Sequence, residues 1–325
     1  MAGGVEAWLQ RRWYGGVSPN PVLRFVAGMY HIAIGLRGVA YDRGWMASHR
    51  VPAKVIVVGN FTAGGTGKTP LILALAERLS IAGWRPAIVS RGHGRQSHAP
   101  VRVEAATPAS ECGDEPKLLH ERSGLPVFVD SDRVAACLRA VEAGCDVVLA
   151  DDGLQHRRLR RDVEIEVIDG ERRYGNGLLL PAGPLREKPR PVGWRVVNGG
   201  EARPGEWPMM LRFSALRSLR GDEACDISAF VGCQVHAVAG VGHPQRFFAA
   251  LRRQGLEIVE HAFPDHHRFE AADFAGMAAP IVMTEKDAVK CRVLGLEGAW
   301  YAPVAAELPD AFYSGLFEVL QAPSA

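Results

Sequence analysis

The stretch VIVVGNFTAGGTGKTPLILALAERL at residues 55–79 decides the fold of this chain. Apolar residues at 55–58 predict a buried strand, a turn rich in glycine and threonine follows, and leucines recur after Gly67 among residues that favour a helix. A strand, a glycine-rich turn and a helix in this order are typical of a phosphate-binding loop, because glycines let successive backbone N–H groups face a polyphosphate. The strict pattern has glycine where this chain has Thr62, so a glycine-rich turn without a ligand is the alternative.

The residue types in this loop assign roles within it. The Lys68 ammonium is expected to reach the β- and γ-phosphates, and the Thr69 hydroxyl is expected to hold Mg²⁺. The helix that begins here adds the partial positive charge of its N-terminus. The expected nucleotide-binding residues are those of the loop itself, namely Thr62, Ala63, Gly64, Gly65, Thr66, Gly67, Lys68 and Thr69.

A pair of carboxylates follows a second apolar strand. In CDVVLADDGLQH, residues 145–156, four apolar residues lead into Asp151 and Asp152. A carboxylate at the carboxyl end of a strand beside a phosphate loop acts on Mg²⁺ in phosphoryl-transfer proteins. A metal role is therefore expected for both, and the alternative is that one of them only caps the turn at Gly153.

The overall composition excludes several classes of protein. The 38 basic residues are almost balanced by 36 acidic ones, and the net charge of +2 does not predict a nucleic-acid-binding protein. The six cysteines form no CxxC pair and no zinc-finger spacing, so reduced thiols are expected in place of a metal cluster or a disulfide framework. With 325 residues and 47% hydrophobic content, the chain is long enough for one large or two medium soluble domains.

Alternating strand and helix patterns predict an α/β fold with a mostly parallel sheet. A phosphate-loop NTPase core is expected over residues 46–205, where these patterns recur. The stretch NGGEARPGEWP at residues 198–208 is rich in glycine, proline and glutamate and is the best candidate for a domain boundary. A smaller C-terminal α/β lobe is expected over residues 206–325.

Aromatic and basic residues flank a short apolar run in the N-terminal segment, residues 1–45. The run lies between Arg24 and Arg37 and is too short to span a bilayer, and no small-residue cleavage site follows it. Apolar residues flanked by arginines and aromatic residues suit a helix that lies in the membrane interface. A helix packed on the body of the protein is the alternative.

Further polar motifs are candidates for the same site. The loop SRGHGR at residues 90–95 follows a strand and either contacts an anion or forms a solvated turn. The cluster FPDHHRF at residues 263–269 places two histidines beside Asp265, either facing a cleft between the lobes or in a helix-start loop that Asp265 caps. TEKD at residues 284–287 is similar to the guanine-reading TKxD pattern, but the register fails, so GTP is not inferred.

Taken together, these motifs are specific to one family. The chain resembles the tetraacyldisaccharide 4′-kinases, the lipid A 4′-kinases of Gram-negative bacteria, and Thr62 is what this family has in its phosphate loop. His93 and Leu154 are mild departures from the family's common SRGYG and DDGFQH. The shared motifs run through most of the chain and are VGNFTAGGTGKTP, SRGHGR, GDEP, DDGLQH, LLPAGPLRE, FPDHHRF and TEKDAVK.

The resemblance implies a lipid kinase that works at a membrane surface. It implies transfer of phosphate from ATP, with Mg²⁺, to the 4′-hydroxyl of a glucosamine disaccharide 1-phosphate that carries four acyl chains. The expected location is the cytoplasmic face of the inner membrane, in peripheral contact, with no obligate protein partner. A lipid substrate favours the interfacial interpretation of the N-terminal helix, because the substrate is embedded in the bilayer.

The resemblance also implies an active site between the lobes, with residues taken from matching motifs. In GDEP, Asp114 looks like the catalytic base, and Glu115 is expected to help at the metal alongside the two carboxylates of DDGLQH. A histidine of FPDHH is expected to assist the base, and position in the motif favours His266 over His267. The expected catalytic set is Asp114, His266 and Lys68, and the expected metal set is Thr69, Asp151, Asp152 and Glu115.

Two other functions stay open at the level of residue patterns alone. One is a membrane-associated ATPase switch in which hydrolysis drives a conformational cycle, and the other is a nucleotide-binding scaffold without turnover. A switch needs a partner surface or a homodimer and no hydroxyl acceptor. A kinase needs an acid/base group on the acceptor side, which Asp114 and the FPDHH cluster provide.

Overall fold

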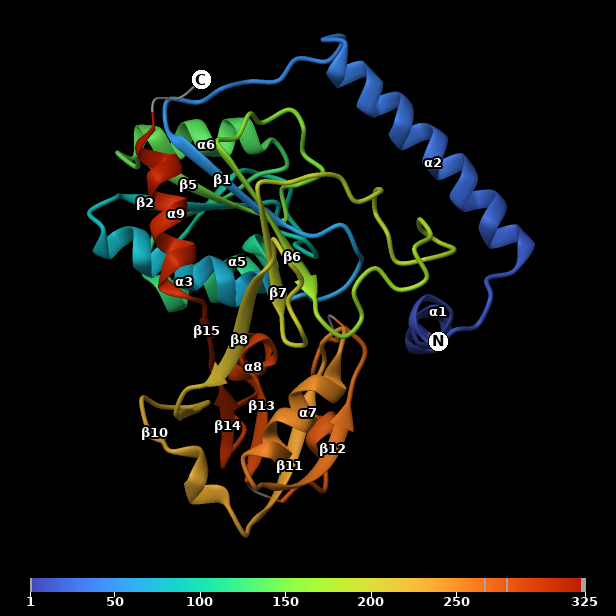
Figure 1. Ribbon diagram of the computed structural model, residues 1–325. Helices are drawn as coiled ribbons and strands as arrows, with labels where there is room; N and C mark the ends of the chain where they lie inside the picture. Colours follow the sequence, from blue (N-terminus) through green and yellow to red (C-terminus); the bar gives the residue numbers. More distant parts are fainter. Residues whose placement is uncertain (1, 266, 279, 323–325) are drawn as a thin grey trace.

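The strand before the phosphate loop is the central strand of a nine-stranded sheet in the computed structural model, which describes residues 2–265, 267–278 and 280–322 (Figure 1). The strand order is β15-β8-β7-β6-β1-β5-β2-β4-β3, and all neighbours are parallel except β15 with β8 and β3 with β4. The prediction of a mostly parallel sheet is confirmed. The strands are β1 (Lys54–Gly59), β2 (Pro86–Ser90), β3 (Val101–Val103), β4 (Val127–Val129), β5 (Val147–Asp151), β6 (Val163–Asp169), β7 (Trp194–Asn198), β8 (Trp207–Phe213) and β15 (Val304–Glu307).

Helices cover both faces of this large sheet. Because side chains alternate along a strand, Ile56 and Val58 of β1 face one hydrophobic core and Val55 and Val57 face another. The first core is closed by α3, α5 and α9, and the second by α6. The helices of this lobe are α3 (Lys68–Ile81), α4 (Ala109–Cys112), α5 (Asp114–Ser123), α6 (Arg133–Glu142) and α9 (Asp310–Gln321).

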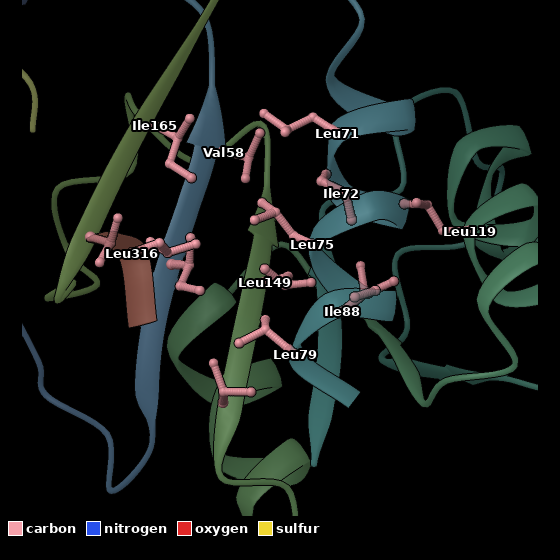
Figure 2. Packing of buried hydrophobic residues seen from close by; sticks show 14 of the residues in the cluster. Val58, Leu71, Ile72, Leu75, Leu79, Ile88, Leu119, Leu149, Ile165 and Leu316 are labelled. Carbon is pink, nitrogen blue, oxygen red and sulfur yellow. The ribbon is translucent and has the colours of Figure 1, made fainter. Parts of the chain in front are cut away.

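The helix that follows the phosphate loop is held by the larger core (Figure 2). Leu71, Leu75 and Leu79 recur at helical spacing on α3, are fully buried at 0% exposure, and lie among strand residues such as Val58 and Leu149. Fully burying one such side chain contributes roughly 1.5–3 kcal/mol. This packing fixes the start of α3, and with it the residues that meet a nucleotide.

A second sheet of six strands forms the smaller lobe, with the order β10-β9-β14-β13-β11-β12 (Figure 1). Its β11, β12, β13 and β14 run parallel, and β9 pairs antiparallel with β10 and β14. The strands are β9 (Leu216–Ser218), β10 (Ala224–Cys225), β11 (Gln234–Ala239), β12 (Glu257–Ala262), β13 (Ile281–Thr284) and β14 (Ala299–Ala302). The helices are α7 (Pro244–Arg253) and α8 (Glu285–Cys291), with short 3₁₀ turns at Ile227–Phe230, Ala271–Phe274 and Arg292–Leu294.

The division between the lobes differs from the expected one at residues 205 and 206. The glycine- and proline-rich stretch there connects β7 to β8, two parallel neighbours in the large sheet, and Met209 of β8 is buried in the core under α3. The chain leaves the large sheet after Phe213 and returns to it at Val304. Two strands and the C-terminal helix that we assigned to the smaller lobe therefore belong to the larger one.

The N-terminal segment forms two helices, α1 (Ala2–Tyr14) and α2 (Pro21–Asp42), and α2 runs along the outside of the molecule (Figure 1). Asn20 caps α2, because its side chain accepts a hydrogen bond of 2.8 Å from the Leu23 N–H, and Pro21 follows at the first helical position. The helix has 22 residues and contains an apolar stretch that by length and composition is enough to cross a membrane. Our expectation that it is too short counted only the residues between Arg24 and Arg37.

Candidate active site

The phosphate loop leaves β1 at the carboxyl edge of the large sheet and enters α3 at Lys68. Gly67 has a φ of 97°, and a side chain there would overlap the Asn198 side chain, so glycine is required. Asn60 is buried at 1% exposure, donates to the Thr62 carbonyl at 2.7 Å, and accepts from the Lys68 ammonium at 3.0 Å. Asn60, which precedes the glycine-rich residues, thus helps to fix the conformation of the loop.

Not every N–H group of the loop faces inward. The Ala63 N–H donates to the Pro184 carbonyl at 2.7 Å, which ties the loop to the segment that carries LLPAGPLRE. On the other side, the Asn198 amide donates to the Thr66 carbonyl at 2.9 Å. The loop between β1 and α3 is therefore anchored at both ends by the chain around it.

The two consecutive aspartates lie in different electrostatic environments. Asp152 accepts from Arg186 at 2.6 Å, and its other oxygen lies 3.3 Å from the Lys68 ammonium. Although burial acts to raise it, the charges of Lys68 and Arg186 lower the pKa of Asp152. Asp151 is buried at 3% exposure, and burial together with the nearby charges of Glu115 and Asp152 raises its pKa to about 7.

The turn that carries these aspartates is held by a buried arginine. The Arg133 guanidinium donates to the carbonyl oxygens of Asp151 and Asp152, at 2.9 Å each. Asp152 has a φ of 49°, a left-handed conformation that is uncommon for a residue other than glycine. The Ser90 hydroxyl also donates to the Asp151 carboxylate at 3.1 Å. The turn is thus held by contacts from two other segments, the start of α6 and the end of β2.

The oxygen atoms at this edge suit Mg²⁺. Among the residues that the structure describes, no group of three or more His, Cys, Asp or Glu side chains is arranged to hold a metal ion. Magnesium, however, is usually bound through one or two carboxylates, with substrate phosphates and water completing its shell. Asp151 fits this chemistry, because a buried carboxylate between the like charges of Glu115 and Asp152 gains from a cation beside it. Thr69 lies in the first turn of α3.

The GDEP motif lies beside the SRGHGR loop. A side chain built on Gly113 would lie 3.2 Å from the His93 carbonyl oxygen, so the two loops touch. Asp114 is half-buried and is the first residue of α5. Glu115 lies 3.2 Å from the Lys286 ammonium, which comes from the TEKD motif of the smaller lobe.

The smaller lobe approaches the phosphate loop closely at one point. A side chain built on Gly242, in the loop between β11 and α7, would lie 3.5 Å from the Gly65 nitrogen and 3.4 Å from the Asp265 carboxylate. From α7, Arg246 donates to the Asn198 carbonyl at 2.7 Å. The FPDHH cluster and the phosphate loop therefore approach each other across the boundary between the lobes.

The two histidines of FPDHH differ in what the structure describes. His266, the expected partner of the base, lies outside the described residues. His267 has its Nε2 atom 2.9 Å from the Asp273 carboxylate, stacks on Phe263 with ring centres 4.8 Å apart, and meets Phe269 edge-on. These contacts hold the His267 ring within its own lobe.

The model of one protein family, described as Tetraacyldisaccharide-1-P 4'-kinase, matches residues 19–321. The chain belongs to this family. Curated members named Tetraacyldisaccharide 4'-kinase include that of Xanthomonas euvesicatoria pv. vesicatoria, 52% identical over 95% of this chain and 94% of its own. The one from Xylella fastidiosa is 47% identical over 99% of this chain and 98% of its own. The predicted family resemblance is confirmed.

A solved structure of this 4′-kinase family has the same fold. It is the crystal structure of LpxK from Aquifex aeolicus in complex with ATP, 27% identical, with a TM-score of 0.75 over 91% of this chain and 97% of that one. The prediction of a phosphate-loop core with a smaller α/β lobe is confirmed. Membership of a kinase family also decides against the switch and the scaffold.

Four residues that contact the predicted site residues were not singled out by the sequence patterns. Asn60 lies in VGNFT, Arg186 in PLRE and Lys286 in TEKD, so each stood in a motif that we had read for other reasons. Arg133 follows a strand and a turn with no motif to mark it. A polar residue inside an otherwise apolar or turn-rich motif is the signal available for Asn60 and Arg186.

Proposed function

We propose that this chain transfers the γ-phosphoryl group of ATP to the 4′-hydroxyl of a tetraacylated glucosamine disaccharide 1-phosphate, a step of lipid A biosynthesis. The observation that carries the proposal is that residues around Asp114 and FPDHH lie beside the phosphate loop, because the Glu115 charge acts on Asp151 and Gly242 lies near both Asp265 and Gly65. Lys68 of the phosphate loop lies 3.3 Å from Asp152, while Lys286 joins Glu115, next to Asp114, to Asp265 of FPDHH. A hydroxyl acceptor needs a carboxylate opposite the phosphate loop, and a hydrolytic switch does not.

The donor side of the reaction depends mainly on charge. Lys68 is held between Asn60 and Asp152, so its ammonium is positioned before the nucleotide arrives. As the bond between the γ-phosphorus and the bridging oxygen of ADP breaks, that ammonium stabilises the negative charge on the phosphoryl oxygens. Thr69, Asp151, Asp152 and Glu115 are the residues that would hold Mg²⁺, which when bound neutralises phosphate charge.

The acceptor side depends on proton transfer. Asp114 accepts the proton of the 4′-hydroxyl while the sugar oxygen forms its bond to the γ-phosphorus, and ADP leaves with the electron pair of the broken bond. A histidine of FPDHH orients the Asp114 carboxylate and shares the proton. Because His267 is engaged by Asp273, the arrangement supports His266 in that role.

The substrate is a lipid, and α2 offers a surface for a bilayer. Apolar side chains recur every three or four residues on its outer face, with exposures of 68% for Val22, 70% for Phe25, 59% for Met29, 63% for Ile32 and 67% for Leu36. A stripe at this spacing on an exposed helix is typical of a helix in a membrane interface.

Contacts along the other face of α2 favour a helix that lies on the membrane over one that crosses it. The Tyr30 hydroxyl donates to the Arg186 carbonyl at 2.9 Å, and near the far end Arg157 pairs with Asp42 at 3.1 Å. A helix that crossed the bilayer would have to leave these contacts. Arg186 in turn donates to Asp152, so this one residue connects α2 to the proposed metal site. We place the enzyme peripherally on the cytoplasmic face of the inner membrane, where ATP is present.

The acid/base assignment is tested with the labelled γ-phosphate of ATP and a lipid disaccharide 1-phosphate in mixed micelles. Asp114→Asn keeps the shape of the side chain and removes the base, so turnover should fall by about two to four orders of magnitude with ATP affinity nearly unchanged. Normal turnover in a variant that still binds ATP would mean that the base lies elsewhere, with Asp152 the next candidate.

The histidine assignment is tested in the same assay. His266→Ala should lower turnover, and adding it to Asp114→Asn should cost hardly more than Asp114→Asn alone, because residues that act as one unit lose their effect together. His267→Ala is the matched control and should keep most of the turnover. If His267→Ala reproduces the Asp114 defect and His266→Ala does not, the two histidines exchange roles.

A further inference from the structure

Helix α5 of the larger lobe packs against helix α8 of the smaller lobe, and ion pairs line this boundary. Arg122 donates to both carboxylate oxygens of Glu285 at 2.6 Å, and Arg292, just beyond α8, donates to Glu121 at 2.6 Å. Both pairs lie in the second half of α5. A third contact lies at the beginning of α5, where the candidate base Asp114 is the first helical residue.

This third contact is made by Lys286, and it differs from the others in having partners in both lobes. The Lys286 ammonium lies 3.2 Å from Glu115 of the larger lobe and 3.4 Å from Asp265 of the smaller lobe. Its side chain is only 17% exposed. The ammonium is thus held between two carboxylates that come from different lobes.

The two carboxylates that Lys286 joins are each next to a residue of the acid/base pair. Glu115 follows Asp114 at the start of α5, and Asp265 precedes His266 in FPDHH. Glu115 and Asp265 both lie within 3.4 Å of the same ammonium, so without that cation the two carboxylates would repel each other. The lysine therefore sets the distance between two short segments that belong to different lobes.

We propose that Lys286 is a positioning residue for phosphoryl transfer, which ties Glu115 to Asp265 and so aligns the Asp114 end of α5 with the FPDHH segment. This inference rests on the proposed function, because alignment matters only if both segments serve one reaction. Glu121 lies six residues further along α5, about 9 Å at 1.5 Å per residue, so the pair it makes is remote from the base.

The direct test is Lys286→Met, which keeps the length of the side chain and removes its charge. Turnover of the lipid should fall about tenfold to a hundredfold, while the affinity for ATP, measured by equilibrium binding, stays within about twofold. Arg292→Met is the matched control, since it removes a cation from the same boundary, and its turnover should stay within about twofold of the unmodified enzyme. Unchanged turnover in Lys286→Met would overturn the proposal.

A second set of variants distinguishes two explanations of a loss in Lys286→Met: loss of the alignment of the two segments, and repulsion between the carboxylates that Lys286 neutralises. Asp265→Asn breaks the tie from the other side, and the double variant Lys286→Met with Asp265→Asn leaves no surplus carboxylate facing Glu115. If Lys286 acts as a tie, the two single variants and the double variant lose about the same turnover. Losses that multiply, or recovery in the double variant, would contradict the tie.

The double variant also covers the case in which Lys286→Met does not fold, because it no longer has two carboxylates facing each other. Failure of the proposed function would be seen differently. In that case the unmodified enzyme itself would not label the lipid, whereas failure of this inference would leave the unmodified enzyme active and Lys286→Met equally active.

Discussion

Two regions differ from the usual pattern of apolar interior and polar surface. The edge of the large sheet that carries the phosphate loop buries polar side chains, whereas the outer face of α2 exposes apolar ones. At the sheet edge, polar groups are buried, with exposures of 1% for Asn60, 3% for Asp151 and 6% for Arg133. On α2, apolar groups are exposed, with 70% for Phe25 and 67% for Leu36. Buried polar groups and exposed apolar surfaces are the informative exceptions to apolar interiors.

Under the proposed function, each region is complementary to a different part of the reaction. Buried polar groups need hydrogen-bond partners and buried charges need ion pairs, and the contacts among Lys68, Asp152 and Arg186 form an edge that suits the phosphates of a nucleotide. Exposed apolar groups are complementary to acyl chains. The Tyr30 contact to the Arg186 carbonyl joins the two regions, so a lipid at α2 and a nucleotide at the loop are served by neighbouring residues.

The largest effect is expected at the buried polar edge. Lys68→Ala removes the cation that stabilises the transferring phosphoryl group, so turnover should fall by roughly two orders of magnitude or more. The far-ultraviolet circular dichroism spectrum should be unchanged, because Lys68 takes no part in the hydrophobic core. Near-normal turnover by a well-folded Lys68→Ala enzyme would contradict the assignment of this loop as the phosphate-binding loop.

A pair of core and surface substitutions tests whether α2 contributes to folding. Leu75→Ala, at a fully buried position of α3, should lower the free energy of unfolding by about 2–5 kcal/mol. Ile32→Ala, at a position of α2 that is 63% exposed, should change it by no more than about 0.5 kcal/mol. Both values come from denaturant unfolding of the purified protein. A large loss in Ile32→Ala would mean that α2 is a packed helix and the comparison fails.

Much of the site was predictable because phosphate chemistry requires particular residues in consecutive order. The loop from Thr62 to Thr69 and the Asp151–Asp152 pair each carry their function in a local pattern. The family resemblance added Asp114 and the FPDHH cluster, which composition and spacing alone left ambiguous.

The rest depended on contacts between residues far apart in the chain. The stretch at residues 198–208 has the composition of a linker between domains, yet it connects two neighbouring strands of one sheet. Only the pairing of β7 with β8 shows that both strands belong to the same sheet. The return of β15 to β8 joins Val304 to Phe213, which no local pattern shows. Lys286 lies in the failed guanine motif and in the family motif TEKDAVK, but neither gives it a role, because its partners Glu115 and Asp265 come from separate segments.

A smaller effect is expected for single apolar residues on α2. Phe25→Ser should weaken partitioning onto vesicles that contain anionic lipids by about tenfold, since part of the free energy of burying one aromatic side chain is lost. Sedimentation with vesicles measures this, and raising the salt concentration should weaken binding of both proteins by screening the arginines. Full-length protein that stays in solution with such vesicles at low salt would show that α2 does not bind membranes.

The smallest effect concerns a histidine beside the buried polar edge. Burial, together with the charge of Arg133, lowers the pKa of His156 to about 4, below its ordinary value of 6.5. The unfolded chain therefore binds a proton that the folded chain does not between these two pH values, and stability is lost as the pH falls through that window.

This linkage is measured as the midpoint of thermal unfolding. Lowering the pH from about 7 to about 5 should lower the midpoint of the unmodified protein by roughly 2–4 °C more than that of His156→Gln. His98→Gln, at an exposed position, is the control and should follow the unmodified protein. An equal fall in all three proteins would mean that His156 is not a buried neutral group.

Transfer of labelled phosphate to the lipid tests the central claim most directly. The unmodified enzyme is incubated with ATP labelled at the γ-phosphate and a tetraacylated disaccharide 1-phosphate, and the lipid product is separated and its phosphorylated position determined. We predict that label enters the lipid at the 4′-oxygen in step with formation of ADP. Formation of ADP with the label released only as inorganic phosphate would contradict a kinase and indicate a hydrolytic switch.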